Sequence, residues 1–195
     1  IKRPDGELLV AFRRAPDRRL FGQEGITHTD ANSYLVMVRS LYGENWTKEP
    51  DLIFAHPFGG SQDPCLLQLK DGTLICTSYT WGPIRSDADS ILNAKITLHK
   101  GKGQVPTFTF LGGYIVRSVN GGKSWQGPIY PINVPTDVQQ NVYGKPLPAY
   151  NRGALYEGKE GLIYWVVASK DAESLNTTST HLLTSAAILS YRYSR

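Results

Sequence analysis

The chain has 195 residues, enough for one domain with a sizeable core, and its formal net charge is +4. No apolar run reaches the roughly 18 residues of a membrane-spanning helix. We therefore expect no membrane span. The basic residues form no stripe with interleaved aromatic residues, so we also expect no nucleic-acid binding. The 19 glycines and 12 prolines favour an all-β chain of short strands and turns over a helical bundle.

Two types of strand alternate along the chain. The first type follows a turn that contains glycine, and it occurs at 5–12, 71–79 and 160–167, where we expect inner strands. The second type ends in serine and occurs at 34–40, 114–118 and 181–185. This self-similarity predicts about three repeat units of roughly 67 residues, with an insertion between Gly82 and Phe110 in the middle unit.

Two cysteines, Cys65 and Cys76, flank the predicted turn of the second unit. A simple hairpin register pairs residue 67 with 76 and residue 65 with 78, so the two cysteines do not face each other. A disulfide between them is therefore one alternative, and two buried free thiols are the simpler one.

The stretch Ser118–Trp125 reads S-V-N-G-G-K-S-W and predicts a tight turn. Asn and Gly accept left-handed backbone, the short polar side chains can bond nearby N–H groups, and Trp125 offers an apolar ring for packing. A copy that is one residue shorter lies at 40–46. The end of the stretch also matches a phosphate-binding loop, but Arg117 stands where that motif requires glycine, and no helix is expected after it.

Each unit reads as a small antiparallel sheet whose faces neighbouring units must cover. Radial stacking of such sheets gives a β-propeller, typically with four to eight blades. We expect a single partial propeller domain over 1–195, with approximate blades 1–60, 61–132 and 133–195. Three blades cannot close a ring, so we expect either a larger propeller or self-association. The start at Ile1 rather than Met predicts processing or truncation, and a β-sandwich with chance repeats is the alternative fold.

The Ser118–Trp125 turn and the repeated strands resemble the sialidase superfamily, the six-bladed Asp-box propellers. The resemblance covers nearly the whole chain and matches the first half of that fold. It implies that Asp30, shortly before the strand at 34–40, is the general acid/base. The segments 61–66 and 151–155 enter the second and third inner strands in the family manner. A secreted or periplasmic location is also implied, although no signal sequence opens the chain.

Other catalytic residues of that family have no assignable position here. The first residue of its arginine triad would precede Ile1, and the other two arginines, the tyrosine nucleophile and its glutamate partner come from later blades. The resemblance implies a sialidase-like glycoside hydrolase, or its N-terminal half, that acts on a terminal sugar such as sialic acid. The alternatives are a non-catalytic carbohydrate-binding or scaffold propeller, and an Asp-box hydrolase of a neutral sugar such as arabinose.

The residues themselves also suggest a site. Asp30 lies in a polar loop, where a carboxyl could protonate a leaving glycosidic oxygen or simply cap a turn. Arg13 and Arg14 could bind a carboxylate or sugar hydroxyls, although only one of two adjacent strand residues can point inward. Asp63 and Arg152 hold corresponding places in successive units, as substrate contacts or as an ion pair between blades. We expect a carbohydrate or glycoconjugate substrate, and neither cofactor nor metal, because the histidines show no ligand spacing.

Overall fold

The computed structural model describes residues 1–22, 30–85, 87–88, 93, 95–100, 106–151, 155–170, 172 and 185–192, the last range by its backbone. The described chain is all-β. Its strands are β1 (Leu8–Arg14), β2 (Tyr34–Ser40), β3 (Asp51–Phe54), β4 (Gly60–Gln68), β5 (Leu74–Ile84), β6 (Leu98–His99), β7 (Thr107–Ser118), β8 (Gln126–Ile129), β9 (Leu155–Glu157), β10 (Leu162–Ser169) and β11 (Ser185–Arg192). Two short 3-10 helices accompany them, η1 (Arg18–Phe21) and η3 (Lys159–Gly161).

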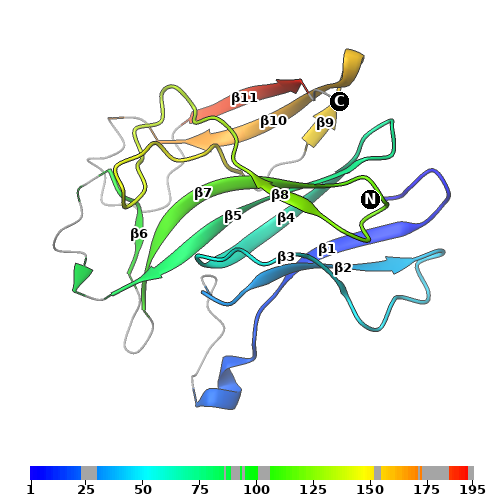
Figure 1. Cartoon of the computed structure of the whole chain (residues 1–195), viewed down its shortest axis with the longest axis horizontal. Coiled ribbons are helices and arrows are strands. Elements are labelled where there is room, and N and C mark those ends of the chain that lie inside the picture. The colour runs from blue at the N-terminus through cyan, green and yellow to red at the C-terminus, as the bar shows by residue number, and fades with distance from the viewer. Residues whose placement is uncertain are drawn as a thin grey trace.

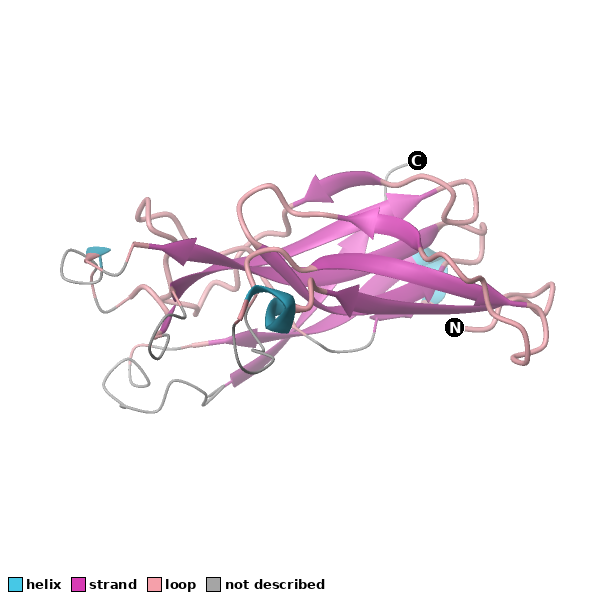
Figure 2. Cartoon of the chain, turned by 90° about the horizontal axis from the view of Figure 1, so that it is seen from below, coloured by secondary structure: helices cyan, strands magenta, loops and turns pink. Residues whose placement is uncertain are grey.

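Three antiparallel sheets lie one on another (Figure 1). The first sheet is β1-β2-β3, the middle sheet is β4-β5-β7-β6 with β8 also paired to β7, and the third sheet is β9-β10-β11. None of these described sheets closes into a barrel. The strands run along one common direction, and the loops gather at the two ends of the stack (Figure 2).

The repeated strands hold equivalent places in the first and middle sheets. The strands with the glycine-containing turns are β1, β5 and β10, and the first two pair with strands of the second type, β2 and β7, which end at Ser40 and Ser118. The partner of β10 is β11, which begins at Ser185, whereas the sequence predicted a strand that ends there, and residues 181–184 lie outside the described residues. A further strand pairs with the other side of two of these strands, since β4 pairs with β5 and β9 pairs with β10. In the first sheet, a single bridge between Lys2 and Leu8 takes the place of this further strand. The strands that we expected to be innermost are therefore second in the middle and third sheets, since β4 and β9 precede them.

The two contacts between sheets form the hydrophobic core. Leu9, Leu35 and Met37 of the first sheet pack on Leu74 and Tyr114 of the middle sheet. The opposite face of the middle sheet contributes Ile75, which packs with Ile163 and Trp165 of the third sheet. Because both of its faces are covered, β5 is an almost continuous buried run, whereas β1 alternates between buried and more exposed positions.

The hairpin between β4 and β5 is offset by one residue from the expected register. The N–H of Leu69 donates to the carbonyl of Thr73 at 2.8 Å, which closes a three-residue turn, so Cys76 faces Leu66 and Cys65 faces Thr77. The two cysteines are not paired with each other and are free thiols. Burial raises the pKa of the Cys76 thiol.

The Ser118–Trp125 stretch forms the predicted turn and joins β7 to the edge strand β8. Ser118 Oγ accepts the N–H of Gly122 at 2.8 Å, and Asn120 Oδ1 accepts the N–H of Ser124 at 3.0 Å. Trp125 packs against the core between the first and middle sheets. This hairpin geometry excludes the phosphate-loop alternative, since no helix follows the glycines.

The shorter copy of this turn, at 40–46, joins β2 to β3. Ser40 Oγ accepts the N–H of Gly43 at 2.8 Å, as Ser118 Oγ accepts that of Gly122. The missing residue shortens the turn but leaves this serine-to-glycine bond in place, and the repeat is thus visible in hydrogen bonding as well as in sequence.

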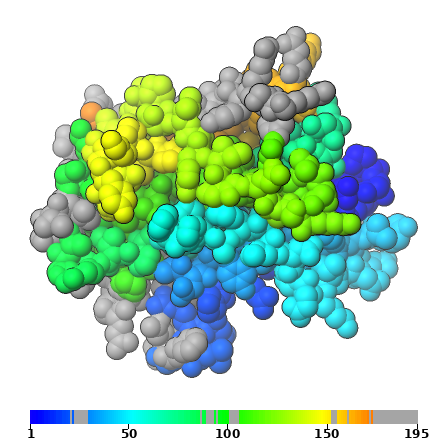
Figure 3. All heavy atoms as spheres, in the orientation of Figure 1, coloured from blue at the N-terminus to red at the C-terminus, as the bar shows by residue number. Residues whose placement is uncertain are grey.

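Segments between the sheets cover their outer edges. The connection from β3 to β4, in cyan, lies against the chain that follows β8 in the space-filling view (Figure 3). His56 Nε2 and the hydroxyl of Tyr130 are 3.3 Å apart at this contact, and the two rings meet edge to face.

Candidate functional site

Buried polar side chains collect at the end of the stack where β1 and β5 end and β2 and β4 begin. Because antiparallel strands alternate in direction, this end brings together the end of β1, the loop before β2 and the start of β4. The buried polar residues there include Asp30, Ser33, Ser61 and Gln62. A buried polar group costs free energy unless it is hydrogen-bonded, so such a group of residues requires a network or a ligand.

Asp30 lies at the boundary between the first and middle sheets and is 5% exposed. Its Oδ1 accepts the N–H of Asn32 at 2.8 Å, which is the turn-capping role, and its Oδ2 lies 3.9 Å from Nε of Arg18. Its carbonyl meets the backbone of β4 so closely that a Cβ at Gly60 would lie 1.5 Å from that oxygen. Glycine at position 60 therefore permits this approach.

Arg13 belongs to the same network through Gln62. Nη1 of Arg13 donates to Oε1 of Gln62 at 2.5 Å, and Nε2 of the fully buried Gln62 donates to Oγ of Ser33 at 3.3 Å. The Ser33 hydroxyl also lies 2.8 Å from the carbonyl of Ser61. Arg14 is on the other face of β1 and is exposed, so one of the two adjacent arginines joins the cluster.

Asp63 lies within β4 rather than before it, at a bulge between Gln62 and Cys65. Its φ of 30° falls in the left-handed region, which is unusual for a residue before proline. The hydroxyl of Tyr79 donates to Asp63 Oδ2 at 2.6 Å and holds the carboxylate. Backbone strain that the surroundings maintain is typical of functional sites, and the bulge points this carboxylate away from the regular ladder.

A second polar group lies beyond Tyr79, next to Tyr150. Nε2 of Gln139 lies 3.2 Å from each carboxylate oxygen of Asp137 and 3.4 Å from the hydroxyl of Tyr150. Burial raises the pKa of both Asp137 and Tyr150. The rings of Phe110, Tyr150 and Tyr79 form one cluster, with centroid distances of 4.3 Å from Phe110 to Tyr150, 5.8 Å from Phe110 to Tyr79 and 6.1 Å from Tyr79 to Tyr150.

The structure places some of the site residues predicted from the sequence together and others apart. The structure brings Arg13 and Asp30 into one network, because the Ser33 hydroxyl that accepts from Gln62 lies 3.0 Å from the carbonyl of Asp30. It places Asp63 one residue beyond Gln62 and leaves Arg14 on the opposite face. Arg152 lies outside the described residues. The residues that the sequence did not single out are Arg18, Ser33, Gln62 and Tyr79.

A guanidinium beside a buried carboxylate can bind and orient a polar substrate. The planar guanidinium matches a carboxylate or two neighbouring hydroxyls, and a carboxyl can exchange a proton with a bound oxygen. Among the described residues, no group of three His, Cys, Asp or Glu side chains could hold a metal ion. No described helix is long and apolar enough to cross a membrane.

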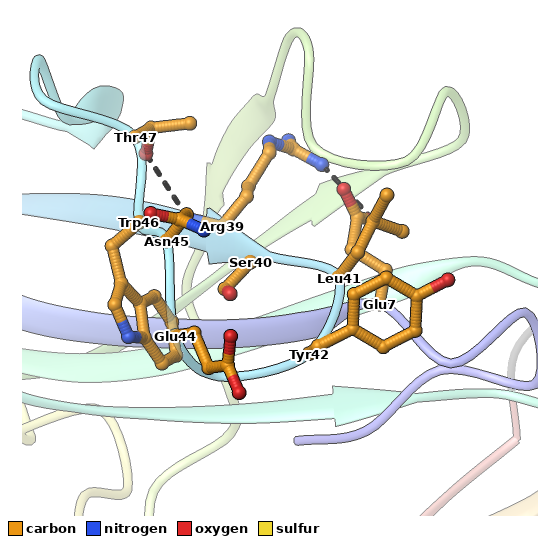
Figure 4. Close-up of a pocket in the computed structure, with 9 residues that line it drawn as sticks. All are labelled: Glu7, Arg39, Ser40, Leu41, Tyr42, Glu44, Asn45, Trp46 and Thr47. Carbon is orange, nitrogen blue, oxygen red and sulfur yellow. Dashed lines mark hydrogen bonds and ion pairs between the residues drawn. The ribbon is translucent and has the colours of Figure 1, made fainter.

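A hollow of about 510 Å³ lies at the opposite end of the first sheet (Figure 4). It forms around the 40–46 turn, where the rings of Tyr42 and Trp46 flank the carboxylate of Glu44. Leu8 pairs with Ser40 here, whereas Arg14 pairs with Tyr34 at the Asp30 end. This hollow is open and formed mainly by one turn, so we regard the buried Asp30 network as the candidate site.

Comparison with known proteins supports the fold. No protein-family model and no curated protein matches the chain. A crystal structure of a protein of unknown function from Dyadobacter fermentans DSM 18053 is similar, with 52% sequence identity and a TM-score of 0.84. The match covers 97% of this chain and 49% of that chain, so this chain spans about half the length of that protein.

Proposed function

We propose that the chain forms part of a sialidase-type β-propeller and carries part of a glycoside hydrolase site. Three features of the architecture support a propeller. The middle sheet contains the four-stranded meander β4-β5-β7-β8, successive sheets pack face to face, and β4 contacts β9 at the edge where each sheet begins. The Asp-box-like turn lies on the far edge of the middle sheet.

The activity that this site supports best is hydrolysis of a terminal sugar, with Asp30 as general acid/base. The observation that carries the proposal is the burial of Asp30 between two sheets, with the Arg18 guanidinium 3.9 Å from its carboxylate. In this role Asp30 gives a proton to the leaving glycosidic oxygen and takes one from the attacking water. Arg13 binds the carboxylate or the hydroxyls of the sugar.

Asp63 and Arg152 complete the proposed contacts with the sugar. Tyr79 fixes the Asp63 carboxylate as a hydrogen-bond acceptor for hydroxyl groups. For a true sialidase we expect retention of configuration through a tyrosine nucleophile contributed by a later blade. Because the chain spans about half of the similar crystal structure, the complete reaction belongs to the longer protein in this proposal.

Sugar binding and cleavage test the proposal separately. We expect the chain to bind methyl α-sialoside in ligand-observed NMR, and Arg13→Ala to weaken binding about tenfold or more. Arg14→Ala is the matched control, because its side chain is exposed on the other face of the same strand. Failure of the folded chain to bind sialosides and arabinosides alike would contradict a carbohydrate site.

Cleavage of a fluorogenic sialoside is measured with the gene's full-length product. Asp30→Asn should abolish release of the fluorophore while thermal unfolding remains cooperative, and Asp87→Asn, at an exposed ion pair, should leave the release unchanged. Sugar binding without cleavage would support the carbohydrate-binding alternative, and cleavage of arabinosides alone would support the neutral-sugar hydrolase.

A further inference from the structure

We infer that the hollow around the 40–46 turn is a binding site for a small alkylammonium compound, such as one that carries a trimethylammonium group. This hollow lies at the end of the first sheet opposite the Asp30 network, so the inference does not depend on the proposed hydrolase activity. Its volume of about 510 Å³ is within the range of roughly 300 to 1,000 Å³ that is typical of small-molecule sites.

The two copies of the Asp-box-like turn use their tryptophans differently. Trp125 of the longer copy packs against the core between the first and middle sheets. Trp46 of the shorter copy is 37% exposed and lines the hollow, next to Tyr42, which is 87% exposed. In the shorter copy, two aromatic rings are therefore presented to solvent rather than to the core.

The shorter copy also lacks the polar side chains that stabilise the longer one. In the longer turn, Asn120 Oδ1 accepts the N–H of Ser124 at 3.0 Å, and Asn120 Nδ2 donates to Ser124 Oγ at 2.8 Å. In the shorter turn, Tyr42 and Glu44 are exposed, and neither side chain has a hydrogen bond or ion pair with another described residue. These two side chains do not hold the turn together and are available to a ligand.

The ring of Trp46 is fixed within the turn. Its Nε1 donates to the carbonyl of Gly43 at 3.0 Å, and the N–H of Gly43 donates to Oγ of Ser40 at 2.8 Å. A ring that is already held in place loses little conformational freedom when a ligand binds. Because its N–H group is used inside the turn, Trp46 offers a ligand the face of its ring rather than a hydrogen-bond donor.

Glu44 supplies a negative charge that its surroundings do not balance. The guanidinium of Arg39 lies 2.8 Å from the carboxylate of Asp51 and 3.5 Å from that of Glu7, and Glu7 also forms an ion pair with Arg3. The arginines beside the hollow are thus already paired with carboxylates, whereas Glu44 is not paired with any described residue. A cationic ligand complements this charge.

The rings and the carboxylate together favour an alkylammonium group. In the view of Figure 4, the carboxylate of Glu44 lies between the rings of Trp46 and Tyr42. The face of an aromatic ring attracts a cation through its quadrupole, and the carboxylate adds a full negative charge. N-methyl groups gain further by leaving water against the rings. A neutral ligand can also stack on the rings, but it does not neutralise Glu44.

An NMR titration of the isotope-labelled chain with choline, at constant ionic strength, tests the inference. We expect saturable shifts of the backbone amides of residues 41–47 and of the Trp46 indole N–H, with a dissociation constant on the order of 1 mM. The uncharged isostere of choline, in which carbon replaces nitrogen, should bind about tenfold more weakly or not at all, because it lacks the charge.

Two pairs of variants separate the contributions of charge and ring. Glu44→Gln should weaken choline binding about tenfold and leave binding of the uncharged isostere unchanged. Glu49→Gln is the matched control, since Glu49 is an exposed carboxylate of the same connection between β2 and β3 and does not line the hollow. Tyr42→Ser should also weaken choline binding, whereas Tyr42→Phe keeps the ring and should not. Unchanged amide shifts in β1 and β2 verify that each variant is folded.

Four results would overturn the inference. These are equal affinities for choline and its uncharged isostere, equal effects of Glu44→Gln and Glu49→Gln, shifts that are confined to residues outside the hollow, and the absence of saturable shifts up to about 50 mM choline. A neutral sugar that shifts the same amides at lower concentration than choline would likewise assign the hollow to carbohydrate instead.

Discussion

At the scale of single residues, Gln62 connects the two sheets that form the candidate site. It accepts a hydrogen bond from Arg13 of the first sheet and donates to Ser33, although it lies on β4 of the middle sheet. Its amide thus satisfies groups on both sides of the contact between sheets, which makes the position sensitive to loss of hydrogen bonding.

We expect Gln62→Met to lower the free energy of unfolding by about 1 to 3 kcal/mol, because it leaves buried polar partners unsatisfied without a large change in volume. Urea denaturation measures this value. Gln126→Met is the matched control, since Gln126 also accepts from an arginine, Arg117, but is exposed, and a change within about 0.5 kcal/mol is expected there. Equal losses in the two variants would contradict a special role for Gln62.

His56 makes stability depend on pH. Burial lowers the pKa of His56 in the folded chain, so between that value and the ordinary value of 6.5 the unfolded chain binds more protons. Stability should therefore fall as the pH is lowered from 7 to 5, and His56→Gln should make this fall shallower. Urea midpoints across this range measure the effect, and the same pH slope in both proteins would contradict it.

At the scale of elements, local chemistry explains which parts the sequence could predict. The turns before β1 and β5 and the Asp-box-like turn are specified by a few adjacent residues, and the structure has them where the sequence predicted them. The predicted register of the β4–β5 hairpin was wrong by one residue, because the length of the turn determines the register and the apolar pattern does not.

The site was less predictable than the turns. Asp30 and Arg13 could be named from sequence, but their partners Arg18 and Gln62 come from a 3-10 helix and from another sheet. Contacts of this kind depend on how sheets stack, which no local pattern encodes. Two features of the sequence could have pointed to these partners. Arg18 lies in an arginine-rich segment, and Gln62 directly precedes Asp63.

The two glycines of the Asp-box-like turn allow a matched test. Both have positive φ, 70° for Gly121 and 84° for Gly122, but a Cβ at Gly122 would lie 2.6 Å from Cε of Met37, whereas a Cβ at Gly121 meets nothing closer than 3.7 Å. Both alanine variants carry the backbone strain, and only Gly122→Ala adds overpacking of about 1 to 3 kcal/mol. Thermal and urea unfolding should rank Gly122→Ala as the less stable variant, and the reverse order would contradict this packing.

At the scale of the whole molecule, the stack has one protected layer and two outer layers. The middle sheet is covered on both faces, whereas the first and third sheets each bury one. Local opening is easier where fewer apolar contacts must break, so the outer sheets should open before the middle one.

Amide hydrogen exchange measures this order. We expect the slowest exchange in β5 and β7 and faster exchange in β1 and β9 at the sheet edges. Exchange of β1 amides as slow as that of β5 amides would contradict the layered order.

The division of the polar network between two sheets has a consequence for ligands. Arg13 belongs to β1 of the first sheet, Asp30 lies in the loop that leads into β2, and Gln62 belongs to the middle sheet. A sugar that contacts both sides acts as a cross-link between the layers, so binding should raise the temperature at which they separate, by an amount set by ligand concentration relative to its dissociation constant. The candidate site thus also connects the first sheet to the middle sheet, and the shift in the thermal unfolding temperature of the chain reports how much ligand is bound.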